Sequence, residues 1–157
     1  MTITTEDLAA ARDAWGAGKV AISKAFEENG IEAARTTADT HLDNLYGYNL
    51  GPVLFKPTMA SGEQTFRITK AGALAYFVGH DTDHPLDNGF AIQGWRSMKS
   101  VTAAEFIEGD VAMWMGWIIL TDKDGNLTQV DKSFGYKKDA DGVLRIVLHH
   151  SSLPYQP

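Results

Sequence analysis

The sequence predicts an α+β domain in which helices come first and strands follow. Apolar residues recur at helical spacing in the first half of the chain. From Phe90 onward, short runs of Trp, Ile, Val, Thr and Phe are instead separated by turn residues. This order is typical of α+β proteins and not of alternating parallel units. Because 157 residues is close to the usual size of one domain and no linker divides them, we expect a single domain over residues 1–157.

Composition excludes several kinds of partner and site. The 14 Lys plus Arg against 20 Asp plus Glu give a formal charge of -6, so neither nucleic acid nor a membrane surface is an expected partner. The chain has 0 Cys, which excludes thiolate nucleophiles and Cys-ligated zinc. We expect no cofactor. The acidic segment Met1–Asp13 does not resemble a secretory signal, so we expect a cytoplasmic protein.

The first helix has clear start and stop signals. Thr4 with Asp7 three residues later is typical of a helix N-cap with an acidic first turn. Apolar residues then follow at helical spacing as far as Phe26. We expect this helix to run to about Glu28 and to stop at Asn29-Gly30, since Gly is a common helix terminator.

Two further helices and one extended segment complete the first half. The same apolar stripe begins again at Ile31 and predicts a helix that ends near Tyr46-Gly47. Thr69 opens a third, shorter helix that continues to Val78. Between them, Val53–Phe55 is expected to be extended, because the residue before Pro57 is pushed out of the helical region.

Four antiparallel strands are predicted in the second half. We place them at about 90–99, 103–120 with a break near 108–110, 127–138 and 143–152. The segments Asp122–Asn126 and Asp139–Gly142 supply the left-handed positions that tight hairpins need. Both are also rich in carboxylates, but neither has the spacing of an EF-hand calcium loop, so the hairpin interpretation is favoured.

The last strand resembles a known family. The segment DADGVLRIVLHHSSLPY (Asp139–Tyr155) is similar to the closing strand of the association domain of calcium/calmodulin-dependent protein kinase II and of its free-standing bacterial relatives. Upstream, VLFKPTMA (Val53–Ala60), GALAYFVGH (Gly72–His80) and the hairpin over residues 121–138 fall in the right order. The resemblance covers about residues 5–155.

The resemblance implies a nuclear-transport-factor-2-like (SnoaL-like) fold, which is a cone-shaped roll of three N-terminal helices packed on a bent, mainly antiparallel sheet. It also implies a tendency to oligomerise. Ser151 and Phe134 stand where kinase association domains carry pocket arginines. Binding of an anion through those arginines is therefore not implied for this chain.

The final hairpin predicts which side chains face the inside of the cone. A tight turn at Asp139–Gly142 pairs Lys138 with Val143 and sets Lys132 opposite His149. By alternation, one face then carries Lys132, Phe134, Tyr136, Arg145, Val147, His149 and Ser151. The opposite face carries Leu144, Ile146, Leu148 and His150.

On this register we expect a partly apolar pocket for a small molecule, with His149 as the catalytic candidate. Its expected ligand-binding residues are Trp15, Tyr46, Tyr48, Lys132, Phe134, Tyr136 and Ser151. Plain core packing is the alternative for each aromatic residue and for His149 itself.

Three kinds of chemistry can be weighed. A histidine base needs a partner that fixes its tautomer, and His149 has Lys132, Asp39 or Asp43 as candidates. Ser151 lies two residues away, but no GxSxG turn is present, so a serine nucleophile is disfavoured. The run His80–His84 has ligand-like composition, although a solvated loop explains it better than a metal site.

The function expected from these features is that of a small-molecule-binding, homo-oligomerising domain that is non-catalytic or weakly catalytic. A cavity enzyme of the isomerase, dehydratase or cyclase type is the alternative, and a pure assembly hub is a third possibility. We expect a homodimer formed through the sheets, because an apolar patch larger than a lone monomer tolerates is predicted there. Its expected members are Met113, Met115, Trp117, Leu144, Ile146 and Leu148.

Overall fold

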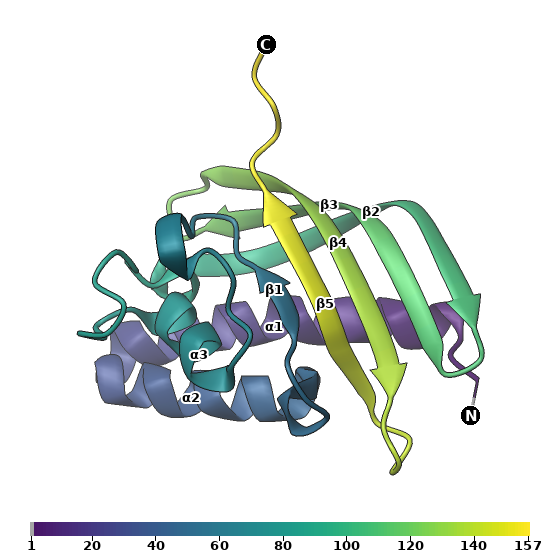
Figure 1. Ribbon diagram of the computed structural model, residues 1–157. Coiled ribbons are helices and arrows are strands. Elements are labelled where there is room, and N and C mark those ends of the chain that lie inside the picture. The colour runs from purple at the N-terminus through teal and green to yellow at the C-terminus, as the bar shows by residue number, and fades with distance from the viewer. Residues whose placement is uncertain (1) are drawn as a thin grey trace.

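The computed structural model describes residues 2–157 and has the expected α+β order (Figure 1). Three α-helices precede the long strands, as predicted. The helices are α1 (Thr5–Asn29), α2 (Ile31–Leu45) and α3 (Lys70–Val78), and short 3-10 turns lie at Gly47–Asn49, Gly62–Gln64 and Phe90–Ile92. The strands are β1 (Leu54–Lys56), β2 (Trp95–Glu108), β3 (Val111–Asp122), β4 (Leu127–Lys138) and β5 (Leu144–Ser152).

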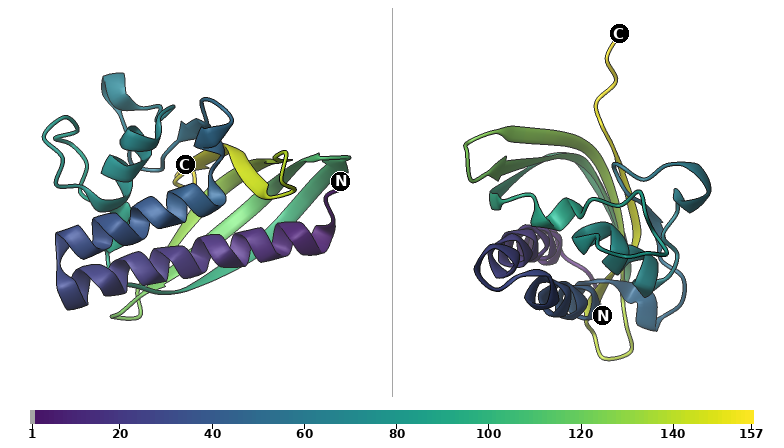
Figure 2. Two further views of the ribbon diagram at one scale, coloured as in Figure 1. Left: turned by 90° about the horizontal axis from the view of Figure 1, so that it is seen from below. Right: turned by 90° about the vertical axis from the view of Figure 1, so that its left-hand side faces the viewer.

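The strands form one bent sheet in the order β1-β5-β4-β3-β2. β1 is the extended segment expected before Pro57, and it pairs parallel with β5, while the remaining pairs are antiparallel. Figure 2 shows α1 and α2 side by side beneath the concave face of the sheet. This is the cone-shaped roll that the sequence predicted.

The helix boundaries follow the expected signals. The Thr4 hydroxyl accepts a hydrogen bond from the Asp7 backbone N–H, and the Asp7 carboxylate accepts one from the Thr4 N–H, which makes a complete capping box. Gly30 separates α1 from α2 with a φ of 86°, a conformation that favours glycine. Thr69 caps α3 through the N–H of Gly72.

The first two long strands are placed differently from the prediction. Residues 108–110 do not interrupt one strand; they are the hairpin turn between β2 and β3, where Glu108 pairs with Val111. Gly109 supplies the left-handed position with a φ of 61°. The stretch predicted as a strand from Phe90 begins with a 3-10 turn, and β2 starts only at Trp95.

The register of the β4–β5 hairpin also differs from the prediction. Lys138 pairs with Leu144 and not with Val143, because the turn at Asp139 contains one more residue than expected. A bulge at Val147 then shifts the register again. Lys132 therefore faces Ser151, and Phe134 faces His149.

The bulge determines which side chains of β5 face inward. His149 and Ser151 are buried as expected, because the two shifts add up to two residues and preserve their face. Nearer the turn the faces are exchanged. Ile146 is buried opposite Tyr136, whereas the prediction placed it outside, and Arg145 binds Asp139 at the rim instead of facing the pocket.

The outer face of the sheet carries exposed apolar side chains. Phe106, Met113, Met115 and Trp117 are all exposed there, and we call these four residues the outer patch. Ile146 does not belong to it, and Leu144 packs against the core. None of the helices in residues 2–157 combines the length and apolar composition that crossing a bilayer requires.

The close crossing of α1 and α2 leads to a stability prediction. A Cβ added at Gly18 would lie 2.1 Å from Nδ1 of the buried His41 ring. Gly18→Ala is therefore expected to lower the free energy of unfolding by roughly 1 to 3 kcal/mol, although the same change normally favours a helix. Denaturant unfolding measures this difference. A variant as stable as the wild type or more stable would show that the helices do not cross as described.

Candidate active site

A buried histidine lies at the centre of the core and uses both of its ring nitrogens. Nδ1 of His149 lies 2.8 Å from the hydroxyl of Tyr46, and Nε2 lies 2.8 Å from Nζ of Lys132. The Tyr46 oxygen also accepts a hydrogen bond of 2.9 Å from the indole N–H of Trp15. These four residues come from α1, the end of α2, β4 and β5, and all are buried.

Aromatic rings enclose this chain of hydrogen bonds. The His149 ring is stacked on Phe55 at 4.3 Å, and Phe55 is its neighbour across the parallel β1–β5 pair. Phe134, its neighbour across the antiparallel pair, lies 4.8 Å away. The sheet order therefore places His149 between two aromatic strand partners.

A cluster of hydroxyl groups lies beside the histidine, at the Ser151 position of β5. The hydroxyls of Thr58 and Ser151 are 2.5 Å apart. The phenol oxygen of Tyr76 accepts a hydrogen bond of 3.2 Å from the backbone N–H of Met59, and it is also hydrogen-bonded to Thr58. We call Thr58, Tyr76 and Ser151 the hydroxyl cluster.

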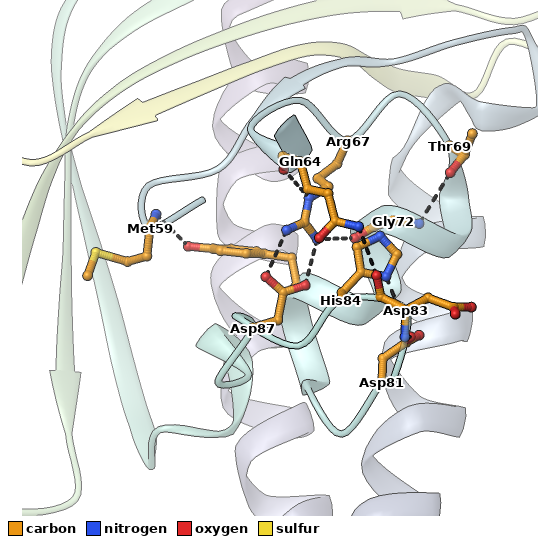
Figure 3. A network of polar contacts seen from close by, with 10 residues as sticks. Met59, Gln64, Arg67, Thr69, Gly72, Asp81, Asp83, His84 and Asp87 are labelled. Carbon is orange, nitrogen blue, oxygen red and sulfur yellow. Dashed lines mark hydrogen bonds and ion pairs between the residues drawn. The ribbon is translucent and has the colours of Figure 1, made fainter. Parts of the chain in front are cut away.

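A buried ion pair fixes the position of the segment that carries Thr58 and Met59. The Arg67 guanidinium forms a bidentate ion pair with the carboxylate of Asp87, with N–O distances of 2.6 and 2.7 Å, and both side chains are buried (Figure 3). Arg67 also donates to the carbonyls of Gln64 and Gly72. A bidentate pair fixes orientation as well as distance. The Arg67–Asp87 pair therefore holds the loop that follows β1 against α3.

A hollow of about 460 Å³ lies between the loop at Leu86–Phe90 and the end of the sheet. Tyr76 is the member of the hydroxyl cluster that lines it, together with Met59. Tyr76 is otherwise buried, and burial raises the pKa of its phenol to about 12. It is therefore a neutral hydrogen-bond donor at ordinary pH.

Two lysines are buried near the histidines. Lys19 and Lys132 both lie over the Trp15 ring, with Nζ 4.3 and 4.6 Å from its centroid. Lys19 also lies 2.8 Å from Nε2 of His41. Desolvation lowers the pKa of Lys132 to about 7, with a further contribution from the charge of Lys56.

Desolvation also lowers the pKa of the ionisable groups around Lys132. Burial lowers the pKa of Lys19, His41 and His149 well below the ordinary values, and neighbouring lysines add repulsion. In the described part of the chain, the charges that act on these groups belong to lysines and histidines. The buried carboxylates Asp87 and Asp139 each pair with an arginine elsewhere.

The expected partners of His149 are partly corrected. Lys132 does contact it, although from the next position of the ladder and not from directly opposite. Asp39 and Asp43 do not, because both bind Lys70 at the surface.

The residues expected to bind a ligand are brought together only in part. Trp15, Tyr46, Lys132, Phe134 and Ser151 are buried around His149. The hydroxyl of Tyr48 instead donates to the carbonyl of Arg67. Tyr136 pairs with Ile146, several residues along the sheet from Ser151, and its hydroxyl has no partner among the described residues.

Two members of the hydroxyl cluster were missed from the sequence. Thr58 and Tyr76 lie in the segments Val53–Ala60 and Gly72–His80, which served only to mark the resemblance. Their positions were a usable signal. Thr58 follows Pro57 just beyond the end of β1, and Tyr76 lies on the largely apolar helix α3. Hydroxyl groups that become buried at such positions need hydrogen-bond partners. At His80–His84 the favoured loop is confirmed, and no group of three or more possible metal ligands occurs within residues 2–157.

Comparison with known proteins identifies the family. The family model described as "Metal-independent carbonic anhydrase" matches residues 6–153. A metal-independent carbonic anhydrase from Nostoc sp. (strain PCC 7120 / SAG 25.82 / UTEX 2576) is 51% identical over 154 residues, which is 98% of this chain and 75% of the relative. The crystal structure of a cyanobacterial iota-carbonic anhydrase complexed with bicarbonate has a TM-score of 0.98 at 50% identity, covering 99% of this chain and 95% of that chain.

Association domains are more distant relatives in structure. One from Xanthomonas campestris, of the calcium/calmodulin-dependent protein kinase II type, has a TM-score of 0.61 at 21% identity and covers 99% of this chain and 91% of that chain. This likeness supports the predicted fold alone.

The comparisons correct two expectations. The expectation of a non-catalytic or weakly catalytic domain was wrong, since the family model, the Nostoc relative and the bicarbonate complex all point to a specific enzyme. The isomerase, dehydratase and cyclase alternative did not name this reaction either. Placing the chain among association domains gave the right fold but the wrong family. The chain belongs to the metal-independent carbonic anhydrase family.

Proposed function

We propose that this protein interconverts CO₂ and bicarbonate without a bound metal ion, at the hydroxyl cluster of Thr58, Tyr76 and Ser151. The observation that carries the proposal is the 51% identity to a metal-independent carbonic anhydrase over 98% of the chain. The bicarbonate bound by the cyanobacterial relative gives the ligand class. A small molecule with three oxygen atoms suits a site built from several hydroxyl donors.

The chemistry needs two kinds of surroundings. CO₂ is apolar and linear, and the aromatic side chains of Phe55 and Tyr76 offer it a dry wall. Negative charge develops on its oxygens as water attacks the carbon, and hydroxyl groups fixed in advance stabilise that charge. The contacts of Thr58 with Ser151 and of Tyr76 with Met59 hold these donors in place.

The proposed site keeps some of the expected residues and omits others. We include Ser151 as a member of the hydroxyl cluster, together with Lys132, its partner across the β4–β5 pair, and His149, which contacts Lys132. Trp15, Tyr46 and Phe134 form the wall behind them. We leave out Tyr48 and Tyr136 because their hydroxyls lie away from Ser151.

We also propose that the protein is a homodimer assembled through the outer patch. Phe106, Met113, Met115 and Trp117 expose neighbouring apolar side chains on strands β2 and β3. A contiguous patch of this kind on a sheet face is typical of a protein interface. A second copy of the same chain is the proposed partner, since most oligomers of soluble proteins are homo-oligomers and two-fold dimers are the commonest of them.

Removal of single hydroxyl groups tests the proposed reaction. Thr58→Val, Tyr76→Phe and Ser151→Ala are each expected to lower kcat/KM for CO₂ hydration by on the order of 100-fold, because each loses one fixed donor. Stopped-flow CO₂ hydration with a pH indicator measures this. Thr37→Val is the matched control, since its hydroxyl bonds only the Ala33 carbonyl within α2.

Chelation provides a second measurement on the same proteins. Wild-type activity is expected to survive dialysis against a strong chelator, whereas a zinc-dependent carbonic anhydrase treated alongside loses its activity as the metal leaves. A wild-type protein without CO₂ hydration activity would overturn the proposal. So would full activity in all three hydroxyl variants.

The dimer has its own test. The wild type is expected to have twice the chain mass of 17.2 kDa at micromolar concentration, and Met115→Lys is expected to be monomeric because it places a charge in the outer patch. Light scattering coupled to size-exclusion chromatography measures both. Leu127→Lys, an exposed position outside the patch, is the control and stays dimeric. A monomeric wild type would contradict the proposal.

A further inference from the structure

Hydration of CO₂ releases a proton, and the buried groups beside the hydroxyl cluster determine where it can go. Ser151 lies directly opposite Lys132 on the β4–β5 ladder, and both side chains are buried on the same face. Residues paired in this way have Cβ atoms roughly 5 Å apart. The Lys132 side chain therefore starts beside Ser151, and its amine lies 2.8 Å from Nε2 of His149, which is two residues before Ser151 on the same face.

We propose that Lys132, in its neutral amine form, takes up the proton released when CO₂ is hydrated. This inference rests on the proposed function and adds to it the group that acts as base. His149 and, behind it, Tyr46 and Trp15 are positioning residues that hold the amine toward Ser151.

Charge balance is the first argument. Only 3% of the Lys132 surface is exposed, and it has no carboxylate partner among the described residues. An ammonium buried in this way costs several kcal/mol more than a neutral amine. Burial and the charge of Lys56 lower the Lys132 pKa to about 7, which is the range where a base works best at neutral pH.

The titratable groups around Lys132 come from several elements. Lys19 of α1 and Lys56 of β1 are coupled to it through charge, and His149 of β5 is hydrogen-bonded to its amine. His41 and Tyr46 lie one hydrogen bond further away, on Lys19 and His149 respectively. The histidines are neutral, because burial lowers their pKa well below the ordinary value. Burial likewise keeps Tyr46 and Tyr76 protonated. Lys56 donates to the backbone carbonyl of Ser151 at 2.9 Å, but it is only half-buried, whereas Lys132 is buried on the inner face of the sheet.

The hydrogen bonds fit an amine that changes charge without rearrangement. The 2.8 Å contacts on the two sides of the His149 ring fit either tautomer, and the inference requires the one with its hydrogen on Nδ1. In that tautomer the neutral amine donates one N–H to Nε2, and Nδ1–H donates to the Tyr46 oxygen. That oxygen also accepts the Trp15 N–H, as a phenol oxygen with two lone pairs can. In this arrangement the lone pair of the neutral Nζ accepts no hydrogen bond from His149 and is available to accept a proton.

The step balances atoms and charge. The water oxygen bonds to the carbon of CO₂, one C=O π pair moves to an oxygen atom, and a proton of the water moves to the lone pair of Nζ. The products are bicarbonate and the Lys132 ammonium, so the net charge of the pocket is the same before and after the reaction. The Trp15 ring, 4.6 Å from Nζ, stabilises the new positive charge through its face.

Substitutions at Lys132 distinguish a lysine that accepts a proton from one that only supplies a positive charge. Lys132→Met is expected to lower kcat/KM for CO₂ hydration by on the order of 100- to 10,000-fold. Lys132→Arg is expected to lose as much, because a guanidinium keeps its charge and accepts no proton. If positive charge alone were needed, the Arg variant would retain activity, and that result would overturn the inference.

The pH dependence of CO₂ hydration provides a second test of Lys132 as the base. Hydration needs the unprotonated amine, so the wild-type rate is expected to fall as pH decreases through about 7, the Lys132 pKa. Lys56→Met removes a like charge that lowers this pKa, so the acid limb is expected to move to higher pH. An acid limb that stays in place in Lys56→Met, or that persists in the residual activity of Lys132→Met, would contradict the assignment.

A measurement without turnover distinguishes this inference from the proposed function. Nitrogen-15 NMR of histidine-labelled wild type is expected to show His149 neutral with its hydrogen on Nδ1, and His149→Gln identifies the signal. A hydrogen on Nε2 would occupy the Lys132 lone pair and overturn the inference even if the enzyme is active. Conversely, a wild type without CO₂ hydration activity would contradict the proposed function. The NMR spectrum would still decide whether His149 carries its hydrogen on Nδ1 and leaves the Lys132 lone pair free.

Discussion

The structure depends on amines that are buried without carboxylates. Lys132 and Lys19 lie over the Trp15 ring and contact neutral histidines, and burial together with the repulsion between the amines lowers the pKa of both. Such a core is costly for stability. In the mechanism that we propose, it supplies a base in a dry pocket in place of a metal-bound hydroxide.

The fold keeps that base in place. The bent sheet brings β1, β5 and β4 side by side, so that Phe55, His149 and Phe134 form a continuous aromatic layer behind the hydroxyl cluster. The Arg67–Asp87 pair fixes the loop from β1 to α3, which carries Thr58. The helices α1 and α2 supply Trp15 and Tyr46 as the far end of the hydrogen-bond chain. One set of rigid elements thus serves both the hydroxyls and the amine.

Much of the fold was predictable, whereas the site was predictable only in part. Local signals such as the Thr4 capping box and Gly30 act within a few residues, so the helices were placed well. The burial of His149 and Ser151 followed from alternation along one strand. The bulge at Val147 could not be foreseen, because it depends on packing across the sheet, and it reversed Arg145 and Ile146. Thr58 and Tyr76 meet Ser151 only through tertiary structure.

The central claim is that Lys132 loses its charge near neutral pH, far below an ordinary lysine, and its own titration tests this most directly. Carbon-13 NMR of lysine-labelled protein follows the carbon next to each amine as pH changes, with Lys132→Met identifying the signal. The account predicts one lysine that titrates near 7, the pKa that burial gives Lys132. A Lys132 signal that titrates above 10, as exposed lysines do, would contradict it.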